Sequence, residues 1–211
     1  MNPGFPVLGD RLPQRRNSIA RRLARAVARL LGWQVVGTFP NVPRAVMIGA
    51  PHTSNVDGVI SMLLLTAMGL HAHTFIKDSA FIGPLGWLLR HLGALPIRRG
   101  QGAGMVEQSI AALRDAEQMW LLLAPEGTRK SAQTWKLGFH HIAHGAGVPV
   151  VIAVIDYRAR RVTLLPARDA GHDASADLSL WLDEIAEHAH PRHPERLSAP
   201  LVAVMERRAR R

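Results

Sequence analysis

The chain has 211 residues, 47% of them apolar and 20% charged, and 26 Lys and Arg against 16 Asp and Glu give a formal net charge of +10. This apolar content excludes a disordered chain, and the length suits one domain. The absence of cysteine excludes disulfides, thiolate nucleophiles and thiolate metal sites. The charge predicts an anionic partner, but charge alone leaves open a nucleic acid, a membrane, a phosphorylated substrate or an acidic carrier protein.

The first segment, residues 1–44, is basic and is predicted to contain an amphipathic helix over residues 18–31. Such a helix can lie on an anionic membrane surface, or it can dock on its own domain with the arginine face in solvent. The first residues contain no apolar stretch of signal-peptide length, so we expect an intracellular protein. The longest apolar stretch, residues 59–70, is shorter than the roughly 18 residues needed to span a bilayer.

Short β-prone runs then alternate with helical segments along residues 45–211. This alternation predicts a single α/β domain whose mostly parallel central sheet is flanked by helices. The arginine-rich end, residues 206–211, is expected to fray. The expected strands are 45–49, 73–77, 94–97, 119–123, 148–155 and 161–165, and the expected helices are 56–68, 85–91, 105–117 and 177–188.

His52 and Asp57 follow the strand predicted at 45–49, at the carboxyl end where α/β proteins place their sites. A carboxylate five residues after a histidine can accept the imidazole N–H, fix the tautomer and leave the other nitrogen as a general base. The alternative is an aspartate that caps the following helix beside an unrelated loop histidine.

A second polar segment, residues 126–129, follows the apolar run 119–123. Gly127 allows close backbone approach to a ligand, and the planar fork of Arg129 can bind a phosphate. Glu126 can orient Arg129 or a substrate hydroxyl. An ordinary charged turn is the alternative.

The stretch between these segments, residues 77–99, contains tight turns and further cations, among them Lys77, Arg98 and Arg99. Cations from separate loops can surround one phosphate. The alternative is a solvated basic rim.

Over about residues 45–155, the chain resembles the 1-acyl-glycerol-3-phosphate acyltransferase family of glycerolipid acyltransferases. That family has four ordered blocks, and each one alone is a weak signal. Ala124 stands here in place of the phenylalanine of the third block, and Ala153 stands near the position of a second proline of the fourth. The matching residues are His52 and Asp57 in the first block, Lys77, Pro84, Gly86, Gly93, Ile97 and Arg99 in the second, Pro125 to Arg129 in the third, and Val148 to Ile152 in the fourth.

The resemblance implies transfer of a fatty acyl group from an acyl thioester, acyl-CoA or acyl carrier protein, to the free hydroxyl of a lysophospholipid. It implies 1-acyl-glycerol-3-phosphate as the acceptor, phosphatidic acid as the product, and no metal and no cofactor besides the thioester co-substrate. His52, oriented by Asp57, would be the general base. An anionic membrane surface is the expected partner, with a peripheral position on its cytoplasmic side. The residues that would bind the acceptor are Lys77, Arg99, Glu126, Gly127, Thr128 and Arg129.

Three other functions remain open: the same chemistry on another lysolipid, a non-catalytic lipid carrier, and a nucleic-acid-binding module suggested by charge alone. The last has few aromatic residues and no recognition motif in its favour. His140 and His144 have metal-ligand spacing on a predicted helix, but no third ligand is evident, so we expect a histidine cluster facing the surface or a membrane. Trp33 and Trp87 can lie at a headgroup interface.

Overall fold

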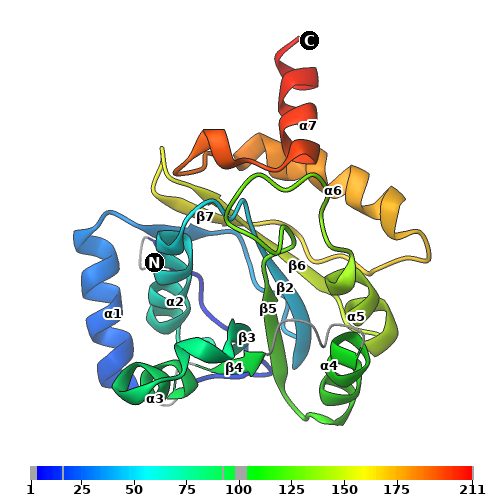
Figure 1. The fold of residues 1–211 in the computed structure, drawn as a ribbon. Coiled ribbons are helices and arrows are strands. Elements are labelled where there is room, and N and C mark those ends of the chain that lie inside the picture. Colours follow the sequence, from blue (N-terminus) through cyan, green and yellow to red (C-terminus); the bar gives the residue numbers. More distant parts are fainter. Residues whose placement is uncertain (1–3, 16, 92, 98–103, 211) are drawn as a thin grey trace.

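A seven-stranded sheet forms the centre of the computed structural model, which describes residues 4–15, 17–91, 93–97 and 104–210 (Figure 1). Within the described residues the strand order is β1-β7-β6-β2-β5-β3-β4. Neighbouring strands run parallel except for β6 and β7, so the predicted mostly parallel sheet is confirmed. The strands are β1 (Gln34–Val36), β2 (Arg44–Ala50), β3 (Ala72–Lys77), β4 (Ala94–Ile97), β5 (Met119–Leu123), β6 (Val150–Asp156) and β7 (Arg161–Leu164).

Helices cover both faces of this sheet (Figure 1), so the central strands are buried on both sides and read as continuous apolar runs. One face packs against α1 (Ser18–Leu30) and α2 (Asn55–Met68). The other packs against α4 (Met105–Asp115), α5 (Gly138–Ala146) and α6 (Ala174–His188). The other helices in the described parts of the chain include α3 (Gly83–His91), α7 (Ala199–Ala209) and the short 3-10 helices Asp78–Ala80 and Pro194–Arg196.

Two elements were missed by the sequence analysis. Strand β1 is short, and its pairing with β7 joins residues 1–44 to the sheet. Helix α7 continues to Ala209, so the expected fraying is wrong for residues 206–209, and Arg211 lies outside the described residues. Although α7 projects from the body in Figure 1, ion pairs to α6 fasten it: Arg207 with Asp183 and Arg208 with Glu187, each at 2.7 Å.

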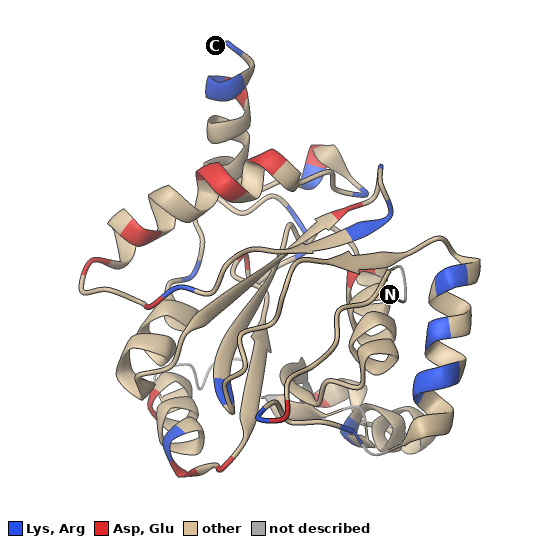
Figure 2. Ribbon diagram, turned by 180° about the vertical axis from the view of Figure 1, so that it is seen from behind, with Lys and Arg blue, Asp and Glu red and all other residues tan. Residues whose placement is uncertain are grey.

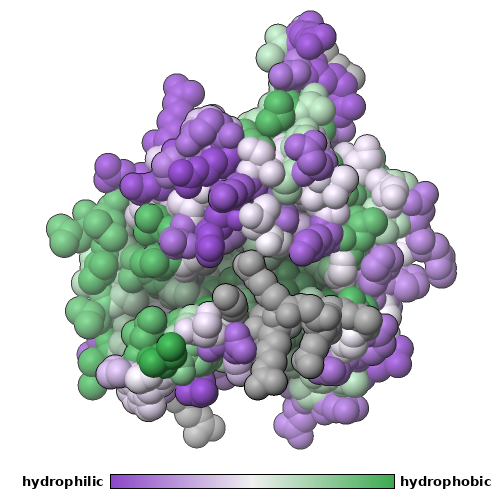
Figure 3. Space-filling view, in the orientation of Figure 1, coloured by the Kyte–Doolittle hydropathy of each residue, from purple (hydrophilic) through white to green (hydrophobic). Residues whose placement is uncertain are grey.

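Helix α1 docks on the domain in an unexpected orientation. Its small residues Ala24 and Ala28 are buried, and the Nε of Arg25 donates to the carbonyl of Ala67 at 2.7 Å, so an arginine-bearing side faces the body. The large apolar residues point outward, with Ile19 and Leu23 78% and 65% exposed. Figure 2 shows the cations along α1. Figure 3, which has the orientation of Figure 1, shows hydrophobic side chains gathered at the edge of the molecule where α1 lies.

A second group of exposed apolar side chains lies on and just before α3, including Ile82, Leu85 and Trp87. Trp87 is exposed, so its place at a headgroup interface stays a prediction, whereas the same prediction is wrong for Trp33, which is buried in the core. Across the described part of the chain, every helix is too short or too polar to traverse a bilayer.

Candidate active site

The turn between β2 and α2 carries the central histidine–aspartate pair. Strand β2 lies between β5 and β6 and delivers His52 to the carboxyl edge of the sheet. Helix α2 begins one residue after Ser54, which caps it in a reciprocal box with Asp57. Asp57 thus takes part in the cap and also lies beside His52, with Nδ1 of His52 3.5 Å from its Oδ2, while its role in orienting a general base stays a prediction.

The Asp57 carboxylate is buried and saturated with donors. Its Oδ2 accepts the backbone N–H groups of Thr53 and Ser54 at 2.7 and 2.8 Å. Its Oδ1 accepts the hydroxyls of Ser54 and Tyr157 at 2.8 and 2.6 Å. Burial favours the neutral acid, but His52 and these donors outweigh it and lower the pKa of Asp57 to about 2. The group is thus a fixed negative charge at neutral pH.

Glu126 joins the pair from the turn after β5. Its side chain is buried, and its Oε1 accepts the backbone N–H of His52 at 3.1 Å. Its Oε2 is buried without a hydrogen-bond partner among the described residues. Burial raises the pKa of Glu126 to about 7, although backbone donors oppose the shift. The described contact is thus to the backbone of His52, while the predicted contact to Arg129 or a substrate hydroxyl stays a prediction.

Tyr157 was missed by the sequence analysis. It follows β6 directly, and its hydroxyl reaches Asp57 across 100 positions of sequence. A usable signal existed, because the residue after a buried parallel strand lies at the same edge as the residues after β2. Tyr157 is also the only tyrosine of the chain.

The other predicted binding residues are placed less directly. Gly127 has φ +62, a conformation that favours glycine, and an added Cβ would lie 2.9 Å from the Lys136 side chain. Thr128 accepts the backbone N–H of Lys130 within its own turn at 3.2 Å, and Arg129 is exposed. The backbone of Lys77 ends β3, its side chain is not described, and Arg98 and Arg99 lie outside the described residues.

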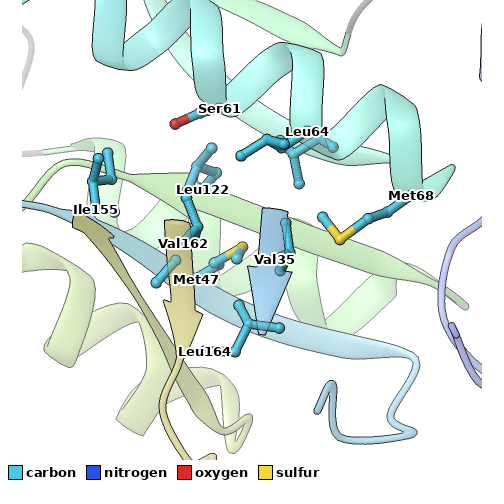
Figure 4. Close-up of a pocket in the computed structure, with 12 residues that line it drawn as sticks. Val35, Met47, Ser61, Leu64, Met68, Leu122, Ile155, Val162 and Leu164 are labelled. Atoms are coloured by element: carbon cyan, nitrogen blue, oxygen red, sulfur yellow. The ribbon is translucent and has the colours of Figure 1, made fainter. Parts of the chain in front are cut away.

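A narrow apolar cavity lies between α2 and the sheet (Figure 4). Ser61, one turn beyond Asp57 on α2, is a polar group in its wall. The volume of this cavity, about 30 Å³, is roughly the space of one water molecule. The largest side chains around it are Met47, Leu64, Leu65, Met68, Leu122, Ile155 and Leu164.

Of the histidines of α5, His140 forms another His–Asp pair. His140 is buried, and its Nε2 lies 2.7 Å from Oδ2 of Asp177 on α6. His144 is exposed, and its Nδ1 lies 2.9 Å from the carbonyl of Ala170. The predicted exposed cluster is therefore wrong for His140, because the face of α5 that bears it packs against α6. No group of three or more metal-ligating side chains is found within the residues described.

Comparisons with known proteins agree with this architecture. A family model described as "Acyltransferase" matches residues 34–156, which include His52, Asp57 and Glu126 but not Tyr157. The crystal structure of the 1-acyl-sn-glycerophosphate (LPA) acyltransferase PlsC from Thermotoga maritima is similar, with a TM-score of 0.57 and 17% identity over 91% of this chain and 79% of that chain. At this identity the likeness shows the fold alone. No curated protein matches the chain.

Proposed function

The chain belongs to the acyltransferase family, and we propose that it transfers a fatty acyl group from acyl-CoA or acyl carrier protein to the free hydroxyl of 1-acyl-glycerol-3-phosphate, giving phosphatidic acid. The observation that carries this proposal is the pairing of His52 with the buried carboxylate of Asp57 at 3.5 Å. The imidazole is the more accessible partner, with 23% of its side chain exposed against 1% for Asp57, so it can meet a substrate.

In the proposed reaction, Asp57 faces Nδ1 of His52, which leaves Nε2 as the base. Nε2 takes the proton of the acceptor hydroxyl while that oxygen attacks the thioester carbonyl carbon. The tetrahedral intermediate then breaks its carbon–sulfur bond, and the departing thiolate takes the proton back from the imidazolium. The negative charge of Asp57 stabilises that imidazolium, so its low pKa suits this role. The side chain of Glu126 accepts the backbone N–H of His52 and so holds the backbone at this turn.

The phosphate and glycerol of the acceptor are proposed to bind at the turn after β5. Gly127 keeps this turn free of a side chain, and Thr128 and Arg129 follow it. The guanidinium of Arg129 can bind the phosphate through two parallel hydrogen bonds. Lys77 and Arg99 are proposed as further cations. Holding the acceptor in this way places its hydroxyl beside His52, and positioning supplies much of the rate.

The acyl chain is proposed to enter the apolar cavity of Figure 4. Ser61 lies one turn from Asp57, so the cavity starts near the proposed reacting groups. It holds only about one water molecule, so side chains must move to admit a chain. The flexible side chains of Met47 and Met68 in its wall suit such a movement.

The protein is also proposed to bind peripherally to an anionic membrane at the cytoplasmic side. The outward residues of α1 and α3 support this, because contiguous exposed apolar patches mark interaction sites, and the exposed Arg22 lies beside the patch on α1. A nucleic acid fits this surface less well, because its phosphates could pair with the cations but would give the exposed apolar side chains no favourable contact.

Vesicle sedimentation tests the membrane proposal. Replacing Ile19 and Leu23 by serine removes two exposed apolar anchors and should weaken binding to anionic vesicles by about 100-fold. Leu180→Ser on α6 is a matched control, since Leu180 is also 65% exposed, and it should bind like the wild type. Equal binding by all three proteins contradicts the proposal, as does a preference for DNA over vesicles.

The activity itself is tested by incubating the purified protein with a panel of lysophospholipids and both thioester donors. Mass spectrometry should detect the diacyl product and free thiol in equal amounts, fastest with the phosphate headgroup. Arg129→Ala should raise the acceptor KM with little change in kcat. Arg210→Ala changes an exposed arginine just beyond the projecting end of α7 and should alter neither constant. A faster reaction with another lysolipid would correct the acceptor, and no product from any pair would contradict the function.

A further inference from the structure

Tyr157 is held at the candidate site from several directions. Its hydroxyl donates to Oδ1 of Asp57 at 2.6 Å. Its ring meets the buried Trp33 edge-on, with centroids 5.1 Å apart and planes at 90°. Its backbone N–H donates to the carbonyl of His190 at 2.8 Å. These contacts leave the hydroxyl little freedom to turn away from Asp57.

The other donors to Asp57 are local to the start of α2, but this one is not. The N–H of Ser54 belongs to the reciprocal cap, which the start of α2 requires anyway, and the N–H of Thr53 and the hydroxyl of Ser54 lie within four residues of Asp57. Tyr157 comes from the end of β6, 100 positions away, and α2 would be capped without it. Its bond therefore serves the carboxylate rather than the helix.

We infer that Tyr157 is a positioning residue for acyl transfer: its hydroxyl fixes the orientation of the Asp57 carboxylate and draws charge from it, and so tunes the imidazole of His52. The inference rests on the function proposed above. A donor on Oδ1 leaves less negative charge on Oδ2, which faces Nδ1 of His52 at 3.5 Å. Burial and the neighbouring Asp57 raise the pKa of the Tyr157 phenol, which therefore remains a donor at neutral pH.

Tyr157→Phe keeps the ring against Trp33 and removes only the hydroxyl. We expect kcat to fall by about tenfold, the effect of losing one hydrogen bond to a charged group. The acceptor KM should stay unchanged. The acid limb of the kcat/KM profile should move to higher pH, because Asp57 then stabilises the imidazolium more strongly. Thr66→Val is the matched control, since it removes a hydroxyl of α2 that donates to the Met62 carbonyl, and should leave the profile unchanged.

Because the chain has one tyrosine, biosynthetic incorporation of 3-fluorotyrosine changes this hydroxyl alone. Fluorination makes the phenol a stronger donor, so the acid limb should move to lower pH, opposite to the shift in Tyr157→Phe. A role limited to packing would move the limb in neither protein. An acid limb at the same pH in all three proteins would overturn the inference.

A second readout needs no turnover. The absorbance of the fluorotyrosine reports its ionisation, which should occur at higher pH in the chain with Asp57 than in Asp57→Asn, where the negative partner is gone. Equal midpoints would overturn the contact whatever reaction the chain catalyses. Absence of transfer by the wild type would instead overturn the proposed function and, with it, the reaction that Tyr157 serves.

Discussion

The described residues contain three histidine–aspartate pairs, and in two of them, His52 with Asp57 and His140 with Asp177, the burial of the two partners is reversed. The aspartates of these two pairs belong to helices on opposite faces of the sheet. In the first, Asp57 is 1% exposed and the imidazole of His52 is 23% exposed. In the second, His140 is 2% exposed and Asp177 is 24% exposed. The contact is 3.5 Å in the first pair and 2.7 Å in the second.

This difference fits the first pair to the catalytic role proposed above and the second to fastening two helices. The tighter contact joins α5 to the first turn of α6, with an imidazole that no substrate can reach. The looser contact leaves the imidazole accessible and saturates the carboxylate. Of these two pairs, distance alone would select the second, whereas the exposure of the imidazole selects the first.

The largest effect on kcat should come from replacing the Asp57 carboxylate by an amide, with the same replacement at Asp177 as the comparison. Asp57→Asn keeps a capping residue but removes the charge that holds the His52 tautomer, so kcat should fall on the order of 10⁴-fold. Asp177→Asn should leave kcat unchanged. Steady-state kinetics on both variants check this, and comparable losses in the two would remove the functional distinction between the pairs.

The buried carboxyl beside the first pair should make stability depend on pH. The raised pKa of Glu126 means that its neutral form stabilises the fold below pH 4.5, and this contribution is lost as the pH rises through about 7. The loss amounts to about 3 kcal/mol. The free energy of unfolding should thus fall less between pH 5 and pH 8 in Glu126→Gln than in the wild type. Parallel pH dependences in urea titrations would show that Glu126 is not titrating in this range.

A smaller effect is expected at the second pair, and on stability only. Asp177→Ala leaves Nε2 of the buried His140 without its partner and should lower the free energy of unfolding by about 2 kcal/mol, with kcat intact. Glu187→Ala, which breaks an exposed ion pair from the same helix, should cost less than about 1 kcal/mol. A loss of activity in Asp177→Ala without a loss of stability would reverse the assignment.

The parts of the candidate site that are formed by residues close together in the sequence could be predicted from local patterns. The strand before His52, the helix after it and the five-residue spacing to Asp57 place both side chains at one turn, so their proximity follows from the sequence. The contact of Tyr157 with Asp57 depends instead on the packing of β6 beside β2: the sequence indicates that Tyr157 follows a buried strand, but not that this strand is the neighbour of β2.

Orientation was harder to predict than periodicity. The amphipathic pattern of α1 predicts a helix with two unlike sides, but the small side chains of Ala24 and Ala28 determine which side approaches the body. Likewise, the spacing of His140 and His144 shows that they share a face of α5, and only the position of α6 decides that His140 is buried.

The most direct measurement is product formation by His52→Ala beside His140→Ala, each with an acyl thioester and 1-acyl-glycerol-3-phosphate, followed by mass spectrometry. If His52 is the base, His52→Ala forms no diacyl product above background while it still binds the acceptor. The folded fraction of His140→Ala should form the diacyl product at the wild-type rate. Wild-type turnover by His52→Ala would contradict the assignment of His52 as the base.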